Sequence, residues 1–345
     1  MRAVVVDDVR AAPVVRDVEE PAPPVGGVVV DVHATGLCRS DWHAWAGHDD
    51  IRFPHVPGHE LAGVISAVGG GVRTWRVGDR VTVPFVCGCG RCRWCRAGEA
   101  QVCPDQEQPG FTHWGSFAER VVLHAADTNL VAVPEDVSMA AAAALGCRFA
   151  TAYRALTARA CVAEGEWVVV VGAGGVGLSA VMIARALGAH VIAVDRTEEA
   201  LDAAARFGAR HTVRADGRSI PDAVRALVPE GADVSIDAVG SETTCADAVL
   251  SLRRRGRHVQ IGLLPSESGL SAVPMARAIA WELDLLGSHG MAAADYPGML
   301  ALIRDGRLRP QDLIERTVGL AEAAQLLPRM PDARPAGLTM IDPRR

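Results

Sequence analysis

Hydrophobic and polar positions alternate in short runs over residues 1 to about 147. Turn residues separate these runs, for example PAPPVGG at 21–27 and GGG at 69–71. Short alternating runs between turns predict half-buried strands, so this part of the chain is expected to form a β-rich domain. The predicted strands are MRAVVV (1–6), GGVVVDVHAT (26–35), LAGVISAVG (61–69), WRVGDRVTV (75–83) and FAERVVL (117–123).

From about residue 150 the pattern changes to strands that alternate with helices. WVVVV (167–171) predicts a buried strand, and VGLSAVMIARALG (176–188) has helical apolar spacing and ends in Gly. The next predicted elements are a strand at 190–195, a helix at 198–209 and a strand within 232–240. Such alternation is typical of a parallel sheet covered by helices on both faces.

The segment from about 290 to 345 contains short helices and a final strand, GLTMID. It is too small to form a domain alone, so we expect it to pack on the first domain. The predicted boundaries are 1–147 for the β-rich domain, 148–288 for the parallel-sheet domain and 289–345 for the returning segment.

Composition and charge narrow the class of protein. Among 345 residues, 49% are hydrophobic and 22% charged, which is the balance of a soluble globular protein. The formal charge of -6 argues against nucleic acid as a partner. The N-terminus does not resemble a secretory signal, and the longest uncharged run, 168–184, is explained by a strand, a turn and a helix. We therefore expect a cytoplasmic protein without a membrane partner.

The turn GAGGVG (172–177) fits the dinucleotide-binding pattern G-x-G-x-x-G. It follows a predicted strand and opens a predicted helix, which is the context that the pattern requires. Gly172 permits the turn, Gly174 lets the backbone approach a pyrophosphate, and Gly177 lets helix and strand pack closely. We include Gly175 among the predicted cofactor-binding residues.

Asp195 follows 18 residues after Gly177, at the end of the next predicted strand. Its carboxylate is able to accept hydrogen bonds from both ribose hydroxyls of NAD and would repel the 2′-phosphate of NADP. NAD is therefore the favoured cofactor. The neighbouring Arg196 is a further cofactor-binding candidate that could offset this repulsion, so dual use stays open.

Four cysteines with the spacing C-x2-C-x2-C-x7-C occupy a short stretch of about 87–103. Cysteines of a chain without an export signal are expected to stay reduced, which favours metal binding over disulfides. Four thiolates close a tetrahedral shell around Zn²⁺, so a structural zinc site is predicted. Its ligands would be Cys89, Cys92, Cys95 and Cys103, with free thiols or a redox pair as the alternative. Cys87 could replace Cys89.

Cys38, His59, Glu60 and Cys147 are metal-ligand residue types that spacing alone does not join. Taken singly, each cysteine could be a small buried hydrophobe and His59 a core residue. The first three nevertheless lie in GLCRSDWH and VPGHELAG, loops that hold ligand-type residues beside turns.

Over nearly its full length the chain resembles the zinc-dependent medium-chain alcohol dehydrogenases. The shared motifs, in the order of that family, are GLCRSDWH, PGHELAGVISAVG with VGDRV behind it, CGRCRWC with Cys103, ALGCRFATAY, and GAGGVG with Asp195. The resemblance implies an α/β fold, in which a Rossmann doubly wound parallel-sheet domain joins a β-rich, GroES-like catalytic domain. It also implies reversible hydride transfer between a primary or secondary alcohol and NAD, forming the aldehyde or ketone.

The resemblance further implies two zinc ions per chain, one catalytic and one structural. Cys38, His59 and Cys147 would hold the catalytic ion, with its fourth position open to water or the substrate oxygen. Glu60 would be a near ligand able to approach the metal, and Asp41 would orient His59. Zn²⁺ would lower the pKa of a bound alcohol and polarise the carbonyl in reverse.

Other positions receive roles by the same matching. Ser40 would take the hydroxyl proton and pass it through the cofactor ribose to His43 at the surface, although from the sequence alone both are ordinary polar residues. Arg39 would contact the pyrophosphate, and Thr151 and Val176 would press on the nicotinamide. The substrate pocket would include Phe85, Trp42 and Trp114.

One position departs from the family pattern, and two other functions remain open. Leu338 stands where many relatives carry an Arg that helps to clamp the cofactor phosphates. The alternatives are a polyol or sugar dehydrogenase of the same fold and a catalytically silent relative that binds NAD. A homo-oligomer is expected, with a tetramer favoured and a dimer possible.

Overall fold

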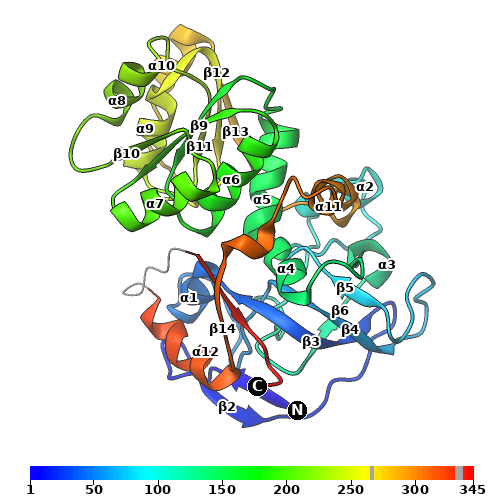
Figure 1. Cartoon of the computed structure of the whole chain (residues 1–345). Coiled ribbons are helices and arrows are strands. Elements are labelled where there is room, and N and C mark those ends of the chain that lie inside the picture. The colour runs from blue at the N-terminus through cyan, green and yellow to red at the C-terminus, as the bar shows by residue number, and fades with distance from the viewer. Residues whose placement is uncertain (265–267, 331–336) are drawn as a thin grey trace. The chain divides into compact units, whose positions relative to one another are not determined.

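The computed structural model describes residues 1–264, 268–330 and 337–345, and it divides into two compact units (Figure 1). The first unit comprises Met1–Ala150 and Gly290–Arg345, and the second comprises Thr151–His289. The C-terminal segment therefore belongs to the same unit as the N-terminal half of the chain. Among the described residues, no helix combines the length and the apolar character that a membrane span needs.

A seven-stranded sheet forms the centre of the first unit. The strands β14, β15, β3, β4, β5 and β7 follow one another across it, and β6 also pairs with β3. β3 pairs antiparallel with β4, β6 and the C-terminal β15, which Figure 1 shows in red beside it. The bounds are β3 (Val28–Leu37), β4 (Leu61–Val68), β5 (Arg80–Thr82), β6 (Arg120–Leu123), β7 (Val131–Ala132), β14 (Ile314–Val318) and β15 (Leu338–Ile341). A separate antiparallel pair consists of β1 (Arg2–Val5) and β2 (Val14–Asp17).

Short helices connect these strands. The valines of β3 pack with Leu61 and Ile65 of β4 and with Val121 and Leu123 of β6 in one buried cluster, which explains why this valine-rich stretch forms the central strand. The helices are α1 (Arg39–Trp45), α2 (Arg93–Arg96), η1 (Ala100–Val102), α3 (Ala126–Asn129), α4 (Met139–Ala144), η2 (Leu145–Phe149), η4 (Ala293–Asp295), α11 (Tyr296–Arg304), η5 (Pro310–Leu313), α12 (Leu320–Leu326) and η6 (Leu327–Arg329). α5 (Ala150–Arg154) begins in this unit and continues into the second.

The second unit contains a six-stranded sheet in the order β10, β9, β8, β11, β12, β13, with every pair parallel. Its strands are β8 (Trp167–Val171), β9 (His190–Asp195), β10 (His211–Arg214), β11 (Ala232–Asp237), β12 (Leu252–Gln260) and β13 (Asp284–Gly287). Its helices are η3 (Ala155–Arg159), α6 (Gly175–Ala186), α7 (Glu198–Phe207), α8 (Ile220–Leu227), α9 (Glu242–Leu250) and α10 (Met275–Trp281). The strand order reverses at β8, as in doubly wound sheets, and confirms the predicted fold class.

The strands and helices around the Gly-rich turn form where the sequence predicts them, because the residues that signal each of them are neighbours in the chain. β8 and β9 coincide with the strands predicted at 167–171 and 190–195. The Thr197 side chain caps α7 by accepting the N–H of Ala200 at 3.3 Å, and the helix ends at Gly208, whose φ is +112°.

The strand predicted at 75–83 is mostly a turn. Only Arg80–Thr82 pair in the sheet as β5. Gly78 has a φ of +96°, and the Asp79 side chain accepts the N–H of Arg76 at 2.8 Å, so the chain turns before the strand begins. β14 was not predicted, since its sequence IERTV contains two charged residues and little apolar surface.

The close packing of α6 against the turn before it makes a prediction about Gly177. A Cβ atom at this position would lie 1.7 Å from the carbonyl oxygen of Gly172. We expect Gly177→Ala to lower the free energy of unfolding by about 1–3 kcal/mol, measured by urea denaturation. Gly174→Ala is the control, because a Cβ there meets nothing within 4 Å. Equal losses in both variants would contradict this explanation.

Candidate functional site

The Asp41 carboxylate connects two of the predicted metal ligands. Cys38 is the N-cap of α1, and its N–H donates to Oδ2 of Asp41 at 2.9 Å. Oδ1 accepts the N–H of Gly58 at 3.1 Å and lies 2.9 Å from Nδ1 of His59. Asp41 is 0% exposed, so one buried carboxylate holds the start of α1 and the turn before β4 together.

The His59 ring has one nitrogen that is satisfied and one that is not. Because a carboxylate only accepts, Nδ1 carries the proton donated to Asp41, and in the neutral ring Nε2 carries the lone pair. Nε2 is buried and has no hydrogen bond of good geometry to any residue that the structure describes. Burial alone would lower the pKa of His59, but the Asp41 carboxylate outweighs it and raises that pKa well above its ordinary value. The site therefore attracts positive charge.

The structure brings Cys38, His59, Glu60 and Cys147 together although they are far apart in the sequence. One ligand atom from each lies within 4.8 Å of the others. The hydrogen bond with Cys147 holds the pKa of the Cys38 thiol well below its usual range, and the same interaction raises the pKa of Cys147. Two sulfurs and an unpaired imidazole nitrogen fit a Zn²⁺ ion, which would displace the shared proton.

Cys147 lies in η2, a π-helical turn between α4 and α5. Such turns occur frequently at functional sites because they displace a side chain from the regular helical position. The Leu145 carbonyl accepts a hydrogen bond from the Tyr296 hydroxyl at 3.2 Å, and the Gly146 carbonyl accepts the N–H of Phe85 at 2.9 Å. These bonds fix the turn that presents Cys147.

Arg148 binds Glu60, and sequence reasoning missed this pair. Oε1 of Glu60 accepts the backbone N–H of Arg148 at 3.1 Å and its Nε–H at 2.9 Å, while Oε2 pairs with the second guanidinium nitrogen. Both residues are buried, and burial raises the pKa of Glu60 although Arg148 opposes this. A Cβ at Gly36 would lie 2.2 Å from Oε2, so β3 leaves the room that the carboxylate occupies.

The residues expected to move a proton lie in α1, Ser40 in its first turn and His43 in its last. The Ser40 hydroxyl oxygen is 3.8 Å from the Cys38 sulfur. Nδ1 of His43 lies 2.8 Å from Nδ1 of His48, a partner that the sequence did not reveal. Burial and then the neighbouring His48 lower the pKa of His43.

The predicted pocket aromatics are not all gathered at one place. The Phe85 ring lies 6.0 Å from the His59 ring, edge to face. Phe111, which sequence reasoning missed, is nearer at 5.1 Å. Trp114 is 39% exposed and donates its ring N–H to the Pro54 carbonyl at 3.0 Å. Trp42 packs against the core cluster of β1 and α12, with the Arg39 guanidinium 5.6 Å from its ring.

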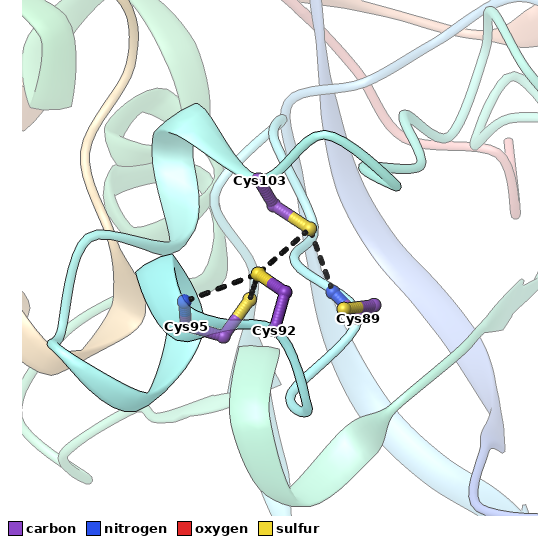
Figure 2. A group of neighbouring side chains, drawn as sticks. All are labelled: Cys89, Cys92, Cys95 and Cys103. Carbon is purple, nitrogen blue, oxygen red and sulfur yellow. Dashed lines mark hydrogen bonds between the residues drawn. The ribbon is translucent and has the colours of Figure 1, made fainter.

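Figure 2 shows the four side chains of the cysteine loop gathered around one point. The Cys92 sulfur lies 3.5 Å from that of Cys95 and 3.7 Å from that of Cys103. Zinc–sulfur bonds of about 2.3 Å in a tetrahedron separate sulfurs by about 3.8 Å, so these distances fit a zinc shell. A backbone N–H of Arg91 lowers the pKa of Cys89 to about 6.

Cys87 lies outside this group. It is buried, its thiol lies 3.5 Å from the Pro84 carbonyl oxygen, and its backbone pairs with Glu107. Burial, reinforced by the Glu107 charge, raises the pKa of Cys87 to about 12. Its sulfur is not among the four that gather within 4.8 Å of one another, which argues against the exchange of Cys87 for Cys89.

The Gly-rich turn of the second unit lies between β8 and α6. Gly172 has a φ of +92°, and the N-cap of α6 is Gly174, which supplies no side-chain cap. Oδ2 of Asp195 accepts the Ala173 N–H at 2.8 Å, which places this carboxylate against the turn. The turn and the carboxylate fit a dinucleotide.

The remaining predicted cofactor residues differ in exposure. Thr151 is buried in α5, Val176 is half-buried in the first turn of α6, and Arg196 is exposed after β9. Leu338, at the position of the expected phosphate clamp, is 1% exposed in β15.

Comparison with known proteins places both units in described families. Residues 24–135 match the family model "Alcohol dehydrogenase GroES-like domain", and residues 175–305 match "Zinc-binding dehydrogenase". The chain is 32% identical to an alcohol dehydrogenase of Geobacillus stearothermophilus, over 90% of each chain. It is 33% identical to a probable D-xylulose reductase A of Aspergillus terreus, over 87% of this chain and 86% of that one. The solved structure of alcohol dehydrogenase TADH from Thermus sp. ATN1 superposes with a TM-score of 0.91 at 30% identity, covering 99% of both chains.

The contacts of Asp41 predict a large effect of its removal. Asp41→Ala leaves three buried donors, on Cys38, Gly58 and His59, without their acceptor. Because each unsatisfied group costs about 1–3 kcal/mol, we expect the free energy of unfolding to fall by at least about 2 kcal/mol in chemical denaturation. Asp49→Ala, an exposed carboxylate after the same helix, is the control and should change it by less than about 0.5 kcal/mol. An equally small change in Asp41→Ala would refute the connecting role.

Proposed function

Because the chain belongs to the zinc-dependent medium-chain alcohol dehydrogenases, we propose that it uses zinc and NAD to interconvert an alcohol and its aldehyde or ketone. The observation that carries this proposal is the buried Nε2 of His59, unpaired within 4.8 Å of the Cys38 and Cys147 sulfurs. A histidine and two cysteines are a known donor set of catalytic zinc, and three protein ligands leave a position for substrate.

Cys38, His59 and Cys147 would hold this zinc, and Cys89, Cys92, Cys95 and Cys103 would hold the structural ion. When bound, the catalytic zinc supplies a Lewis acid that lowers the pKa of an alcohol hydroxyl and polarises a carbonyl. Asp41 keeps the His59 ring oriented through Nδ1. Arg148 neutralises Glu60 and directs its carboxylate, so this ion pair would hold Glu60 back from a bound metal.

Ser40 and His43 would move the proton of the alcohol. The Ser40 hydroxyl lies beside the Cys38 sulfur, at 3.8 Å, where it is suited to accept a proton from a substrate hydroxyl. His43 would receive the proton by way of the cofactor ribose. The contact of His43 with His48 continues the path toward exposed residues after α1.

The Gly-rich turn and Asp195 would bind NAD, which supplies the acceptor for the hydride. Both oxygens of Asp195 accept backbone N–H groups, Oδ2 from Ala173 and Oδ1 from Arg196 at 2.7 Å, so its orientation is fixed. A fixed negative charge accepts hydrogen bonds from ribose hydroxyls and repels a 2′-phosphate, which favours NAD over NADP.

Contacts with other parts of the cofactor are assigned to several further residues. The residues proposed for these contacts are Arg39, Gly175, Thr151, Val176 and Arg196. The buried Leu338 carries no charge for the phosphates, so Arg39 is the proposed cationic contact for the pyrophosphate.

A polyol or sugar dehydrogenase is the second candidate, favoured by the likeness to the D-xylulose reductase. Phe85 and Phe111 place aromatic rings beside His59. An aromatic wall suits an alcohol with an apolar chain better than a polyol, whose hydroxyls lose hydrogen bonds to water unless the pocket replaces them.

A reducing compartment suits this chain, and we propose the cytoplasm. None of the nine cysteines forms a disulfide, and six of them belong to the two proposed zinc sites. Thiols kept for metal binding are stable where disulfides do not form. The expected homo-oligomer, with a tetramer favoured, stays a prediction.

The main experiment removes one ligand of the proposed catalytic zinc. Enzyme dialysed against metal-free buffer should contain two zinc ions per chain and reduce NAD with ethanol, benzyl alcohol or cyclohexanol faster than with sorbitol or xylitol. Cys38→Ser should retain one zinc and lose activity by about 1000-fold or more, because the Lewis acid contributes several kcal/mol. The exposed Cys161→Ser is the matched control. Full activity in Cys38→Ser would refute the mechanism, and a preference for sorbitol would favour the second candidate.

The structural zinc is tested with a pair of neighbouring cysteines. Cys92→Ser should contain one zinc fewer than the wild type, counted by elemental analysis, and should lose the ordered loop. Cys87→Ser should keep both ions, because its thiol lies outside the four-sulfur group. Loss of an ion from Cys87→Ser, with Cys92→Ser unchanged, would assign the ligands differently.

A further inference from the structure

A third group of ligand-type side chains lies outside both proposed zinc sites. It consists of Glu107, His113 and His124, each partly exposed. One carboxylate oxygen and one ring nitrogen from each histidine lie within 4.8 Å of one another. None of the three takes part in the proposed dehydrogenase chemistry, so their convergence needs a separate explanation.

Backbone hydrogen bonds hold the three residues in place. The N–H and the carbonyl of Glu107 both pair with Cys87, each at 2.8 Å. The His113 carbonyl accepts the N–H of Gly110 at 2.9 Å. His124 directly follows β6, whose last residue Leu123 pairs with Val28 of β3. Three separate segments, each with a hydrogen-bonded backbone, thus place these side chains close together. A preorganised metal site requires such a fixed backbone.

When protonated, His124 forms a close ion pair with Glu107, although its Nδ1 makes no hydrogen bond of good geometry with any described residue. Nδ1 of His124 lies 2.6 Å from a carboxylate oxygen of Glu107. This contact raises the pKa of His124 and lowers the pKa of Glu107. A divalent cation that binds both groups replaces this proton, as metal ions do at other histidine and carboxylate ligands.

His113 is neutral and has a nitrogen available. Burial, and then the neighbouring His124, lower the pKa of His113 to about 4. Nε2 lies 3.3 Å from the Val122 carbonyl oxygen, which only accepts, so Nε2 carries the ring proton and Nδ1 the lone pair. The Thr112 hydroxyl lies 3.2 Å from Nδ1, but its single proton is also within reach of the Gln108 carbonyl at 3.1 Å.

A purely structural ion pair accounts for only part of this arrangement. Glu107 and His124 would suffice for it, yet the His113 ring lies 5.0 Å from that of His124, edge to face. Burial and the charge of His124 keep the His113 ring neutral, so this ring adds nothing to the ion pair. A metal ion would use both rings, because it binds imidazole in the neutral form.

We propose that Glu107, His113 and His124 bind a divalent transition-metal ion. Two imidazoles and one carboxylate are a donor set for Zn²⁺, Co²⁺ or Ni²⁺, whereas Mg²⁺ and Ca²⁺ prefer oxygen ligands. Water completes the coordination, since the side chains of Glu107 and His124 are 46% and 35% exposed. The ion would link two parts of the first unit. One is the backbone pairing of Glu107 with Cys87 at the base of the cysteine loop, and the other is the end of β6.

The test counts metal ions in the untagged holoenzyme. Wild-type enzyme and the variants Glu107→Gln, His113→Gln and His124→Gln are equilibrated with excess Co²⁺ and passed through a desalting column, and total zinc plus cobalt is measured. Wild type should carry one ion per chain more than each variant. His211→Gln, a histidine of the second unit, is the control and should match the wild type.

A melting experiment provides an independent measurement. Added Zn²⁺ should raise the Tm of the wild type and of Cys38→Ser but not of the His113→Gln, His124→Gln double variant, because only a site in the folded state couples binding to stability. Equal ion counts and equal Tm shifts in wild type and variants would overturn the proposal. The contact of Glu107 with His124 would then be a structural ion pair alone. Retention of the tightly bound zinc in the variants shows that they fold. Because Cys38→Ser is included, failure of the dehydrogenase mechanism does not affect this result.

Discussion

The buried Asp41 carboxylate is the interaction on which the first candidate site depends. A charge that is 0% exposed is stable only when hydrogen bonds replace its hydration, and Cys38, Gly58 and His59 supply them. Because these donors belong to the start of α1 and to the turn before β4, satisfying one carboxylate also sets the spacing between a sulfur and an imidazole. The same carboxylate selects the tautomer that leaves Nε2 of His59 available as the proposed ligand atom.

Charge balance explains the position of Arg148. Two cysteine thiolates neutralise a divalent cation, so the Glu60 carboxylate would add an uncompensated charge to a buried site. The guanidinium of Arg148 compensates it, with its Nε–H donating to Glu60 at 2.9 Å, and the backbone N–H of Arg148 donates to the same oxygen at 3.1 Å. Arg148 follows Cys147 directly, and so the π-helical turn η2 places a proposed ligand and the counter-charge of Glu60 side by side.

The cysteine loop is built differently from the core. Few of its side chains are buried, and its α2 helix has only four residues, none of them buried. Hydrogen bonds from the backbone N–H groups of Cys89 and Cys95 to the sulfurs of Cys103 and Cys92, both at 3.4 Å, shape the loop around the proposed zinc site. At its base, Cys87 pairs with Glu107 through the backbone and packs in the buried cluster of the sheet. These contacts join the loop to the rest of the unit.

Local patterns alone determined the parallel sheet, the Gly-rich turn with Asp195 and the four-cysteine loop, because their residues are neighbours in sequence and spacing reports directly on geometry. The strand predicted at 75–83 failed where a turn at Gly78 competed with it. Cys38, His59 and Cys147 were joined only by the family resemblance, since spacing says nothing about residues that meet through sheet pairing and helix packing. The Arg148–Glu60 pair, Phe111 beside His59, and the group of Glu107, His113 and His124 were decided by tertiary structure alone. Each depends on contacts between distant segments, and such contacts leave no periodic signal in the chain.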